Sequence, residues 1–112
     1  MAHPLETIRK RSSFVMIREK GKVIRGKSFN VQFLEDHYLN NAIYVGFTAT
    51  KKLGTAIKRN QAKRIMRQLA RKVITKFGKI NSYYVLIAKP PIFEIPFHSQ
   101  EAELKKLITY DS

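Results

Sequence analysis

The pattern of apolar and polar positions predicts three strands in this chain, two by alternation and one by a continuous apolar run. Residues 29–33 and 43–50 place an apolar side chain at almost every second position, so one face of each strand would turn toward a core. Residues 82–88 are almost continuously apolar, which is typical of a strand in the middle of its sheet. Residues 21–27 hold two glycines around two apolar residues and form either a short edge strand or a turn. These segments predict a sheet of about four strands.

Capping residues and prolines delimit two short helices around these strands. The first covers residues 14–20, with Ser12 or Ser13 as its N-cap and Gly21 directly after its end. The last begins at residue 98 or 99, beyond three prolines that break the chain, and runs to residue 108.

The longest predicted helix begins after Thr55 as its N-cap and stops before Gly78. At about 100° per residue its apolar side chains gather into one stripe, the pattern of a helix that lies on a sheet. The stripe consists of Ala62, Ile65, Met66, Leu69, Val73 and Phe77. Beside it, at four-residue spacing, runs a basic row of Arg59, Lys63, Arg67 and Arg71.

The element order αβββαβα predicts an α+β fold of one domain that spans residues 1–112. Its helices would pack on a mixed sheet as a two-layer sandwich. The strands before and after the long helix would pair in parallel as a βαβ crossover, whose handedness the pattern leaves open. Residues 1–11 are polar and basic, and we expect them to form a flexible N-terminal tail.

The positive charge of the chain is concentrated in one segment. Twenty-two Lys and Arg residues against eight Asp and Glu leave a net charge of +14. Residues 51–79 hold eleven of the basic residues and no acidic one. Like charges at four-residue spacing repel one another, and a polyanion removes that penalty. Nucleic acid is the predicted partner, and the alternative is an ordinary solvated helix face. A membrane surface is disfavoured, because the core already needs the apolar stripe.

Several function classes lack the residues that they require. The absence of cysteine excludes disulfides, zinc ribbons and thiol catalysis. No apolar run reaches the length of a membrane span, so we expect a soluble protein of the cytoplasm. The three histidines are far apart in the sequence, and Glu35 and Asp36 would point to opposite sides of a strand. An independent protein nuclease, which needs a base or metal-holding carboxylates, is therefore the least favoured hypothesis.

Residues 45–67 resemble the signature of the bacterial ribonuclease P protein subunit. The segment is VGFTATKKLGTAIKRNQAKRIMR and contains, in order, the VG, KK, G-x-A, RN, KR and final R of that signature. Phe14, Gly21 and the sequence Lys89-Pro90 after the last strand also follow the order of the family. The resemblance covers about residues 8–108 and implies the family's left-handed βαβ crossover.

The resemblance implies an RNA-binding protein without catalytic residues of its own. Members of this family join ribonuclease P RNA, which holds the catalytic Mg²⁺ ions and removes the 5′ leader of precursor tRNA. Together with the basic row, the match gives nine candidate RNA-binding residues: Lys51, Lys52, Lys58, Arg59, Asn60, Lys63, Arg64, Arg67 and Arg71. Arginine can bind phosphate with two hydrogen bonds, whereas Asn60 either contacts RNA or fixes the loop before the helix.

The family resemblance also implies a cleft between the first helix and the sheet for the single-stranded leader. Its candidate residues here are Phe14, Arg18, Gln32, Thr48 and Thr50. Phe14 stands at an aromatic position of the family and either stacks on a base or packs in the core. Arg18 and Gln32 stand where family members have aromatic residues. Arg18 would replace stacking by guanidinium stacking or by a phosphate contact.

The favoured hypothesis is a non-catalytic RNA-binding subunit of a ribonucleoprotein endonuclease, with ribonuclease P RNA and precursor tRNA as partners. The alternative is a ribosome-associated or general nucleic-acid-binding protein.

Overall fold

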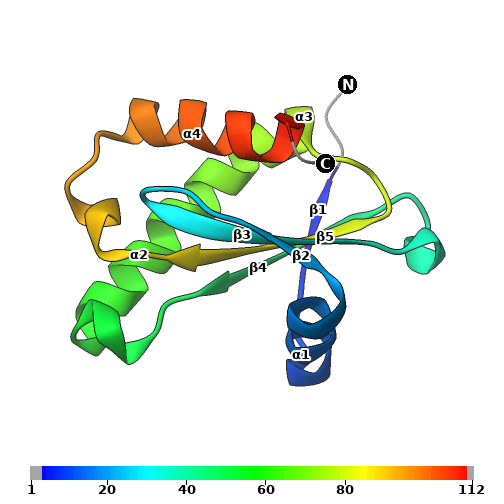
Figure 1. Ribbon diagram of the computed structural model, residues 1–112, viewed down its shortest axis with the longest axis horizontal. Helices are drawn as coiled ribbons and strands as arrows, with labels where there is room; N and C mark the ends of the chain where they lie inside the picture. Colours follow the sequence, from blue (N-terminus) through cyan, green and yellow to red (C-terminus); the bar gives the residue numbers. More distant parts are fainter. Residues whose placement is uncertain (1–3, 111–112) are drawn as a thin grey trace.

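The computed structural model describes residues 4–110, which form a twisted five-stranded sheet covered by helices (Figure 1). The strands are β1 (Leu5–Thr7), β2 (Lys22–Ile24), β3 (Phe29–Glu35), β4 (Ile43–Thr48) and β5 (Ser82–Ala88). Their spatial order is β1–β4–β5–β3–β2, with two parallel and two antiparallel pairs. β5 occupies the central position that its apolar pattern predicts, and β2 is a short edge strand rather than a turn.

The N-terminal segment corrects the predicted fold. Residues 5–7 form β1 beside β4, and the Ile8 N–H continues this pairing by donating to the Val45 carbonyl over 2.8 Å. Ile8 is buried, and Arg11 already belongs to the first helix. The predicted flexible tail is therefore wrong for residues 5–11, and residues 1–3 lie outside the described part. A three-residue strand carries too little periodicity to be seen when its partner is distant in sequence.

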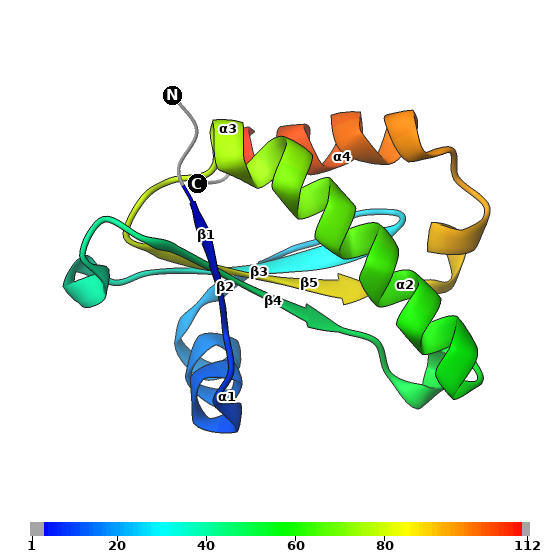
Figure 2. The ribbon, with the colours of Figure 1, turned by 180° about the vertical axis from the view of Figure 1, so that it is seen from behind.

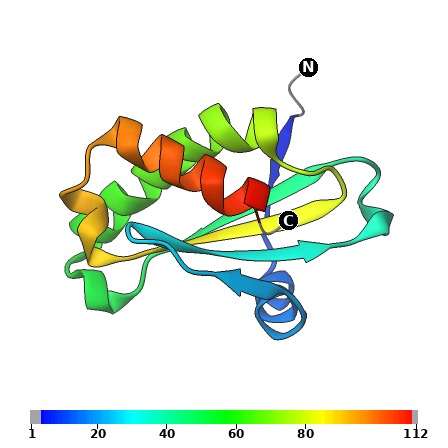
Figure 3. The same ribbon diagram turned by 45° about the horizontal axis from the view of Figure 1, so that its top comes forward.

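Helices cover both faces of the sheet. α2 (Ala56–Leu69) and α4 (Phe97–Tyr110) lie on one face, and α1 (Arg11–Lys20) lies alone on the other (Figure 1). Figure 3 shows α1 beneath β2. The α+β class is confirmed, but with helices on each side of the sheet rather than in a single layer. α1 is held there by Ile17, which is fully buried and clusters with Val85 of β5.

β4, α2 and β5 form the crossover between adjacent parallel strands. In Figure 2 the chain runs to the right along β4, returns to the left through α2 above the sheet, and runs to the right again along β5, behind β4. A path that turns counterclockwise as it moves away from the viewer is left-handed, as the resemblance implied. This hand is rare, because right-twisted strands favour the opposite one.

The main core lies between α2, α4 and the sheet. Most of the predicted stripe is buried, but Phe77 is 43% exposed and Lys105 Nζ lies 4.4 Å from its ring centroid. The cause is a π-helical segment, Ala70–Ile74, between α2 and α3 (Thr75–Phe77). A π turn adds residues per turn, and the side chains that follow it are rotated. Ala70 and Ile74 are buried instead.

The predicted helix starts are right for α2 and shifted for α1. Thr55 caps α2, since its hydroxyl accepts a hydrogen bond from the Lys58 N–H over 3.3 Å. Ser12 and Ser13 lie inside the first turn of α1, whose N-cap is Lys10, without a side-chain hydrogen bond. Only three residues separate the end of β1 at Thr7 from the start of α1 at Arg11, so the helix begins before the serines.

α4 begins at Phe97, slightly before the predicted residue 98 or 99. The Pro96 carbonyl accepts hydrogen bonds from the N–H groups of Ser99 and Gln100, both over 3.1 Å, and so closes the first turn. Proline is suited to a helix start, where it gives up no internal hydrogen bond.

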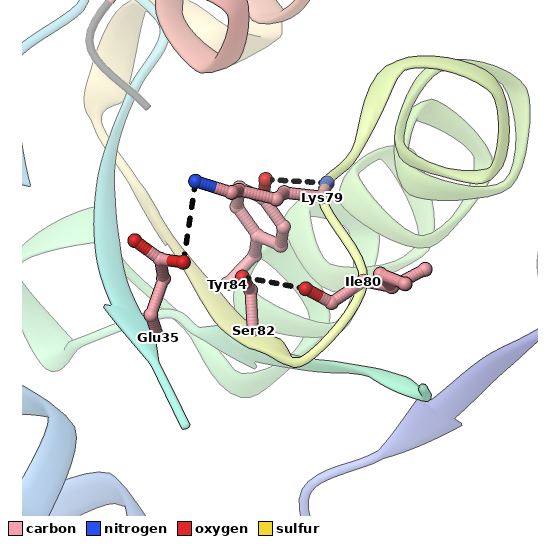
Figure 4. Close-up of polar contacts among 5 residues, drawn as sticks. All are labelled: Glu35, Lys79, Ile80, Ser82 and Tyr84. Carbon is pink, nitrogen blue, oxygen red and sulfur yellow. Dashed lines mark hydrogen bonds and ion pairs between the residues drawn. The ribbon is translucent and has the colours of Figure 1, made fainter. Parts of the chain in front are cut away.

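Polar contacts fix the turn between α3 and β5 (Figure 4). The Tyr84 hydroxyl accepts a hydrogen bond from the Lys79 N–H over 2.9 Å, and Lys79 Nζ lies 3.2 Å from a Glu35 carboxylate oxygen on β3. The Ser82 hydroxyl donates to the Ile80 carbonyl over 3.4 Å. Burial raises the pKa of Tyr84, although the hydrogen bond from Lys79 opposes this shift. The turn is thereby tied to two strands.

Candidate nucleic-acid interface

A basic surface covers the start and the outward side of α2. It consists of the nine predicted residues: Lys51, Lys52, Lys58, Arg59, Asn60, Lys63, Arg64, Arg67 and Arg71. Arg59 and Lys63 are half-buried, and the other seven are exposed. One helix, with its π-helical extension and the 3₁₀ turn η2 (Lys51–Leu53) before it, therefore carries the whole set.

Gly54 sets the direction in which η2 meets α2. Its φ of 121° lies in a region that residues with a side chain rarely adopt. The Gly54 N–H donates to the Lys51 carbonyl over 3.1 Å, and the Gly54 carbonyl accepts from the Arg59 guanidinium over 3.5 Å. These contacts place Lys51 and Lys52 next to the first turn of α2. The lysines of the turn and the cations of the helix thus belong to one surface.

Aromatic rings distinguish the two flanks of α2. The Arg67 guanidinium lies 5.9 Å from the centroid of the Phe47 ring on β4. The other flank faces rings at and before the start of α4: Lys58 lies 5.8 Å from the Phe93 ring and Lys72 lies 5.5 Å from the Phe97 ring. Contacts of this kind hold the aliphatic stems against the protein and leave the charged ends toward water. The two flanks therefore present charge in different directions.

Acidic side chains do not pair with this surface in the described part of the chain. Within residues 4–110, the one ion pair closer than 4.0 Å joins Lys79 to Glu35, beyond the end of the basic surface. The positive charge of α2 therefore faces solvent without a neighbouring counter-charge. Such a surface attracts polyanions.

Arg67 and Arg71 line a small hollow of about 150 Å³ between α2 and the β1 edge of the sheet. Thr7 of β1 and Phe47 of β4 belong to the same lining. Arg71 lies within the π-helical segment, so the row departs from strict four-residue spacing at this point. Sequence reasoning missed Thr7 because it missed β1.

On the α1 side of the sheet, strand register arranges the side chains in three rows. From one end, the rows are Thr48, Ile87 and Asn30; then Gly46, Val85 and Gln32; then Tyr44, Tyr83 and Leu34. α1 crosses the middle row, where the Phe14 ring packs on Gly46 and Ile17 clusters with Val85. The two outer rows lie on either side of the helix, and all six of their side chains are half-buried.

The five predicted cleft residues do not gather at one place. Phe14 and Thr48 come close, because Phe14 packs on Gly46, two residues before Thr48 on β4. Arg18 is exposed one turn further along α1. Gln32 is only 9% exposed, in the row that α1 crosses, and Thr50 lies beyond the end of β4 as the N-cap of η2. Of the five predicted residues, Phe14 and Thr48 are therefore the pair that lies together, at the first row of the sheet beside α1.

Asn30 is a polar residue of the first row that the sequence pattern did not single out. The alternation in β3 puts it on the polar face, but only the register shows that it shares a row with Thr48. Its Oδ1 accepts a hydrogen bond from the Gly26 N–H over 3.2 Å, which leaves its amide NH₂ as a donor.

The side chains of these two regions suit binding to RNA. Cations meet phosphates, while amides, hydroxyls and aromatic rings meet sugars and bases. Among the described residues, no group of three or more His, Asp or Glu side chains could hold a metal ion. No helix within residues 4–110 is long and apolar enough to span a membrane.

Comparison with known sequences agrees with this picture. The family model described as Ribonuclease P matches residues 3–110. The ribonuclease P protein component of Caulobacter vibrioides (strain NA1000 / CB15N) is 38% identical over 84 residues, which are 75% of this chain and 56% of the relative. The chain thus matches little more than half the length of that relative. The component of Syntrophus aciditrophicus is 35% identical over 104 residues, or 93% of this chain and 85% of the relative.

Solved structures share the fold. The RNase P protein from Thermotoga maritima superposes with a TM-score of 0.81 at 23% identity and covers 96% of this chain and 98% of its own. The Staphylococcus aureus RNase P protein superposes with a TM-score of 0.75 at 24% identity and covers 90% of each chain. At these identities the likeness establishes the architecture.

Proposed function

Because the chain belongs to the bacterial ribonuclease P protein family, we propose that it serves as the protein subunit of a ribonuclease P. In this role it binds ribonuclease P RNA and the 5′ leader of precursor tRNA in the cytoplasm. The complex then removes the leader by endonucleolytic hydrolysis. The observation that carries the proposal is the basic surface on η2 and α2, which lacks neighbouring counter-charge within the described residues.

The two sides of the sheet would serve two RNA contacts. We assign the basic surface to the ribonuclease P RNA, where Arg59 and Arg67 bind phosphates. We assign the opposite side to the leader, which would contact Phe14, Arg18 and Thr48. Thr50 lies beside η2, so it belongs with the basic surface. Burial under α1 gives Gln32 a supporting role in the cleft floor.

The chemistry is assigned to the RNA. Hydrolysis assisted by Mg²⁺ requires oxygen ligands for the metal, and the described residues do not bring three His, Asp or Glu side chains together. In the proposed complex the RNA subunit holds the Mg²⁺ ions, as in the family that the chain belongs to. The protein would contribute substrate affinity, because its cations replace counterions along both RNAs.

A reconstitution experiment tests this proposal. The purified protein is added to precursor tRNA with and without a bacterial ribonuclease P RNA, at a Mg²⁺ concentration at which the RNA alone is slow. We expect cleavage at the 5′ maturation site to be stimulated only when both components are present. Cleavage by the protein alone would overturn the assignment of the chemistry to the RNA. Failure to stimulate would favour a general nucleic-acid-binding protein.

The cleft assignment predicts sensitivity to leader length. Replacing Phe14 with Ala removes a ring that can stack on a leader base, which is worth about 1–3 kcal/mol, so KM should rise for long leaders and stay constant for very short ones. Arg18→Gln should act in the same direction, and Lys20→Gln, at the end of α1, is the control with the same charge change. Equal effects at every leader length would refute the assignment.

A further inference from the structure

A second hollow lies on the other side of α1 from the cleft. Its volume is about 380 Å³, and the third row of the sheet forms its floor with Tyr44 and Tyr83. These residues are cross-strand neighbours, and their ring centroids lie 5.7 Å apart at an interplanar angle of 46°. Both side chains are half-buried and line the hollow. Nothing in the proposed function uses this hollow.

The two rings suit a nucleobase as their ligand. Burial raises the pKa of Tyr83, and Asp36 and then Tyr44 raise it further. The shift keeps the Tyr83 phenol uncharged, with a hydroxyl that can donate a hydrogen bond. Uncharged aromatic faces of this kind stack on nucleobases of any sequence.

Charged groups on the rim complement the rings. Arg9 and Lys10 line the hollow and are exposed, and the first turn of α1 next to them holds no acidic residue. Glu6 is the register partner of Tyr44 and also lines the hollow. Its carboxylate can accept a hydrogen bond from the amino group of a base, while the two cations suit a phosphate.

We propose that this hollow binds one nucleotide of single-stranded RNA, with the base against Tyr44 and Tyr83 and the phosphate at Arg9 and Lys10. The site rests on the proposed function, since it assumes that the chain binds RNA. It is distinct from the leader cleft, because Phe14 on Gly46 and the buried Ile17 fill the middle row between them. Tyr44 lies four residues before Thr48 on β4, or about 13 Å along the strand.

The test is a titration of the full chain with a short single-stranded oligo(A) RNA, followed by NMR of the tyrosine rings and by binding affinity. We expect the Tyr44 and Tyr83 ring signals to shift. Tyr44→Leu and Tyr83→Leu, which keep apolar packing, should each weaken binding by about tenfold. The phenylalanine variants keep the ring and should bind nearly as well as the parent chain.

Tyr38→Leu is the matched control, because Tyr38 is 95% exposed on the neighbouring turn and does not line the hollow. It should leave the affinity unchanged, and thermal unfolding of every variant checks that the fold is retained. Leucine variants that bind like the parent chain, or saturation without shifts of the Tyr44 and Tyr83 signals, would overturn the site. If the chain stimulates ribonuclease P RNA but gives one of these two results, the nucleotide site is wrong and the proposed function stands. If the chain does not stimulate the RNA, the proposed function itself is wrong.

Discussion

At the residue scale, the absence of a side chain at Gly46 decides where the Phe14 ring lies. A Cβ atom at Gly46 would come within 2.5 Å of Phe14 Cε1 and 3.2 Å of Ile8 Cδ1. The first distance is shorter than any ordinary carbon contact. The Phe14 ring therefore fills space that is free only because residue 46 is glycine. The position of a proposed stacking group thus depends on a residue that has no side chain of its own.

Gly46→Ala should displace the Phe14 ring from its packed position on β4. We expect a loss of about 1–3 kcal/mol in the free energy of unfolding, measured by urea denaturation, because an added methyl group overpacks the site. The double variant Gly46→Ala with Phe14→Leu should recover part of this loss, since the smaller side chain makes room. Additive effects in this double-mutant cycle would show that the two residues are not coupled.

Tyr84 predicts a loss of stability at alkaline pH. Burial raises its pKa above the ordinary value of 10.0, so the unfolded chain loses this proton first and folding weakens as the pH rises from 10.0 through the folded value. Tyr84→Phe should flatten this decline. At neutral pH it should lower the free energy of unfolding by about 1 kcal/mol, because the bond from the Lys79 N–H is lost. Urea denaturation across the pH range measures both effects, and the exposed Tyr38→Phe should follow the parent chain.

At the element scale, α2 combines two tasks that lie on different sides of one helix. Its apolar stripe closes the core, and its basic row runs along one flank of the helix, where Arg67 lies over the Phe47 ring of β4. The π-helical segment at its end lets the helix bury Ala70 and Ile74 while Arg71 still reaches the hollow beside Arg67. Binding and folding therefore place separate demands on the same segment.

The basic row predicts a measurable salt dependence. Arg67→Gln should lower the slope of log affinity for ribonuclease P RNA against log salt concentration by about 0.7–0.9, the value for one lost phosphate contact. Lys106→Gln on α4 removes the same charge away from the basic surface and should leave the slope almost unchanged. Equal slopes for the parent chain, Arg67→Gln and Lys106→Gln would mean that Arg67 is solvated and does not contact a phosphate.

The sequence predicts elements whose signals are local and misses those that depend on distant partners. Period-two alternation located β3 and β4, and the Thr55 cap located α2. β1 is too short for a periodic signal, and the π-helical segment shifts the stripe so that Phe77 leaves the core. The site follows the same rule. The basic surface lies on one helix and the turn before it, whereas the burial of Gln32 and the row shared by Asn30 and Thr48 depend on strand register.

At the scale of the whole molecule, the net charge of +14 acts over the entire fold. The principal extents are 36 × 29 × 21 Å, and electrostatic screening acts over about 30 Å at 0.01 M salt but over only about 8 Å at 0.15 M. At low ionic strength nearly every cation therefore repels every other one. The uncompensated charge that would bind RNA also opposes folding of the free protein.

This conflict predicts that salt stabilises the isolated chain while it weakens RNA binding. The free energy of unfolding in urea should rise between about 0.01 M and 0.15 M salt, because screening removes the self-repulsion. Lys51→Gln with Lys52→Gln should stabilise the fold at low salt by a few tenths of a kcal/mol for each repulsion removed, and should bind RNA more weakly. Glu19→Gln on α1 changes the charge in the opposite direction and should destabilise the fold at low salt. Stability that does not change with salt in any of these proteins would show that the charges are too well solvated to interact. The cations of the basic surface would then be solvated without repelling one another, and a polyanionic partner would have no repulsion to relieve.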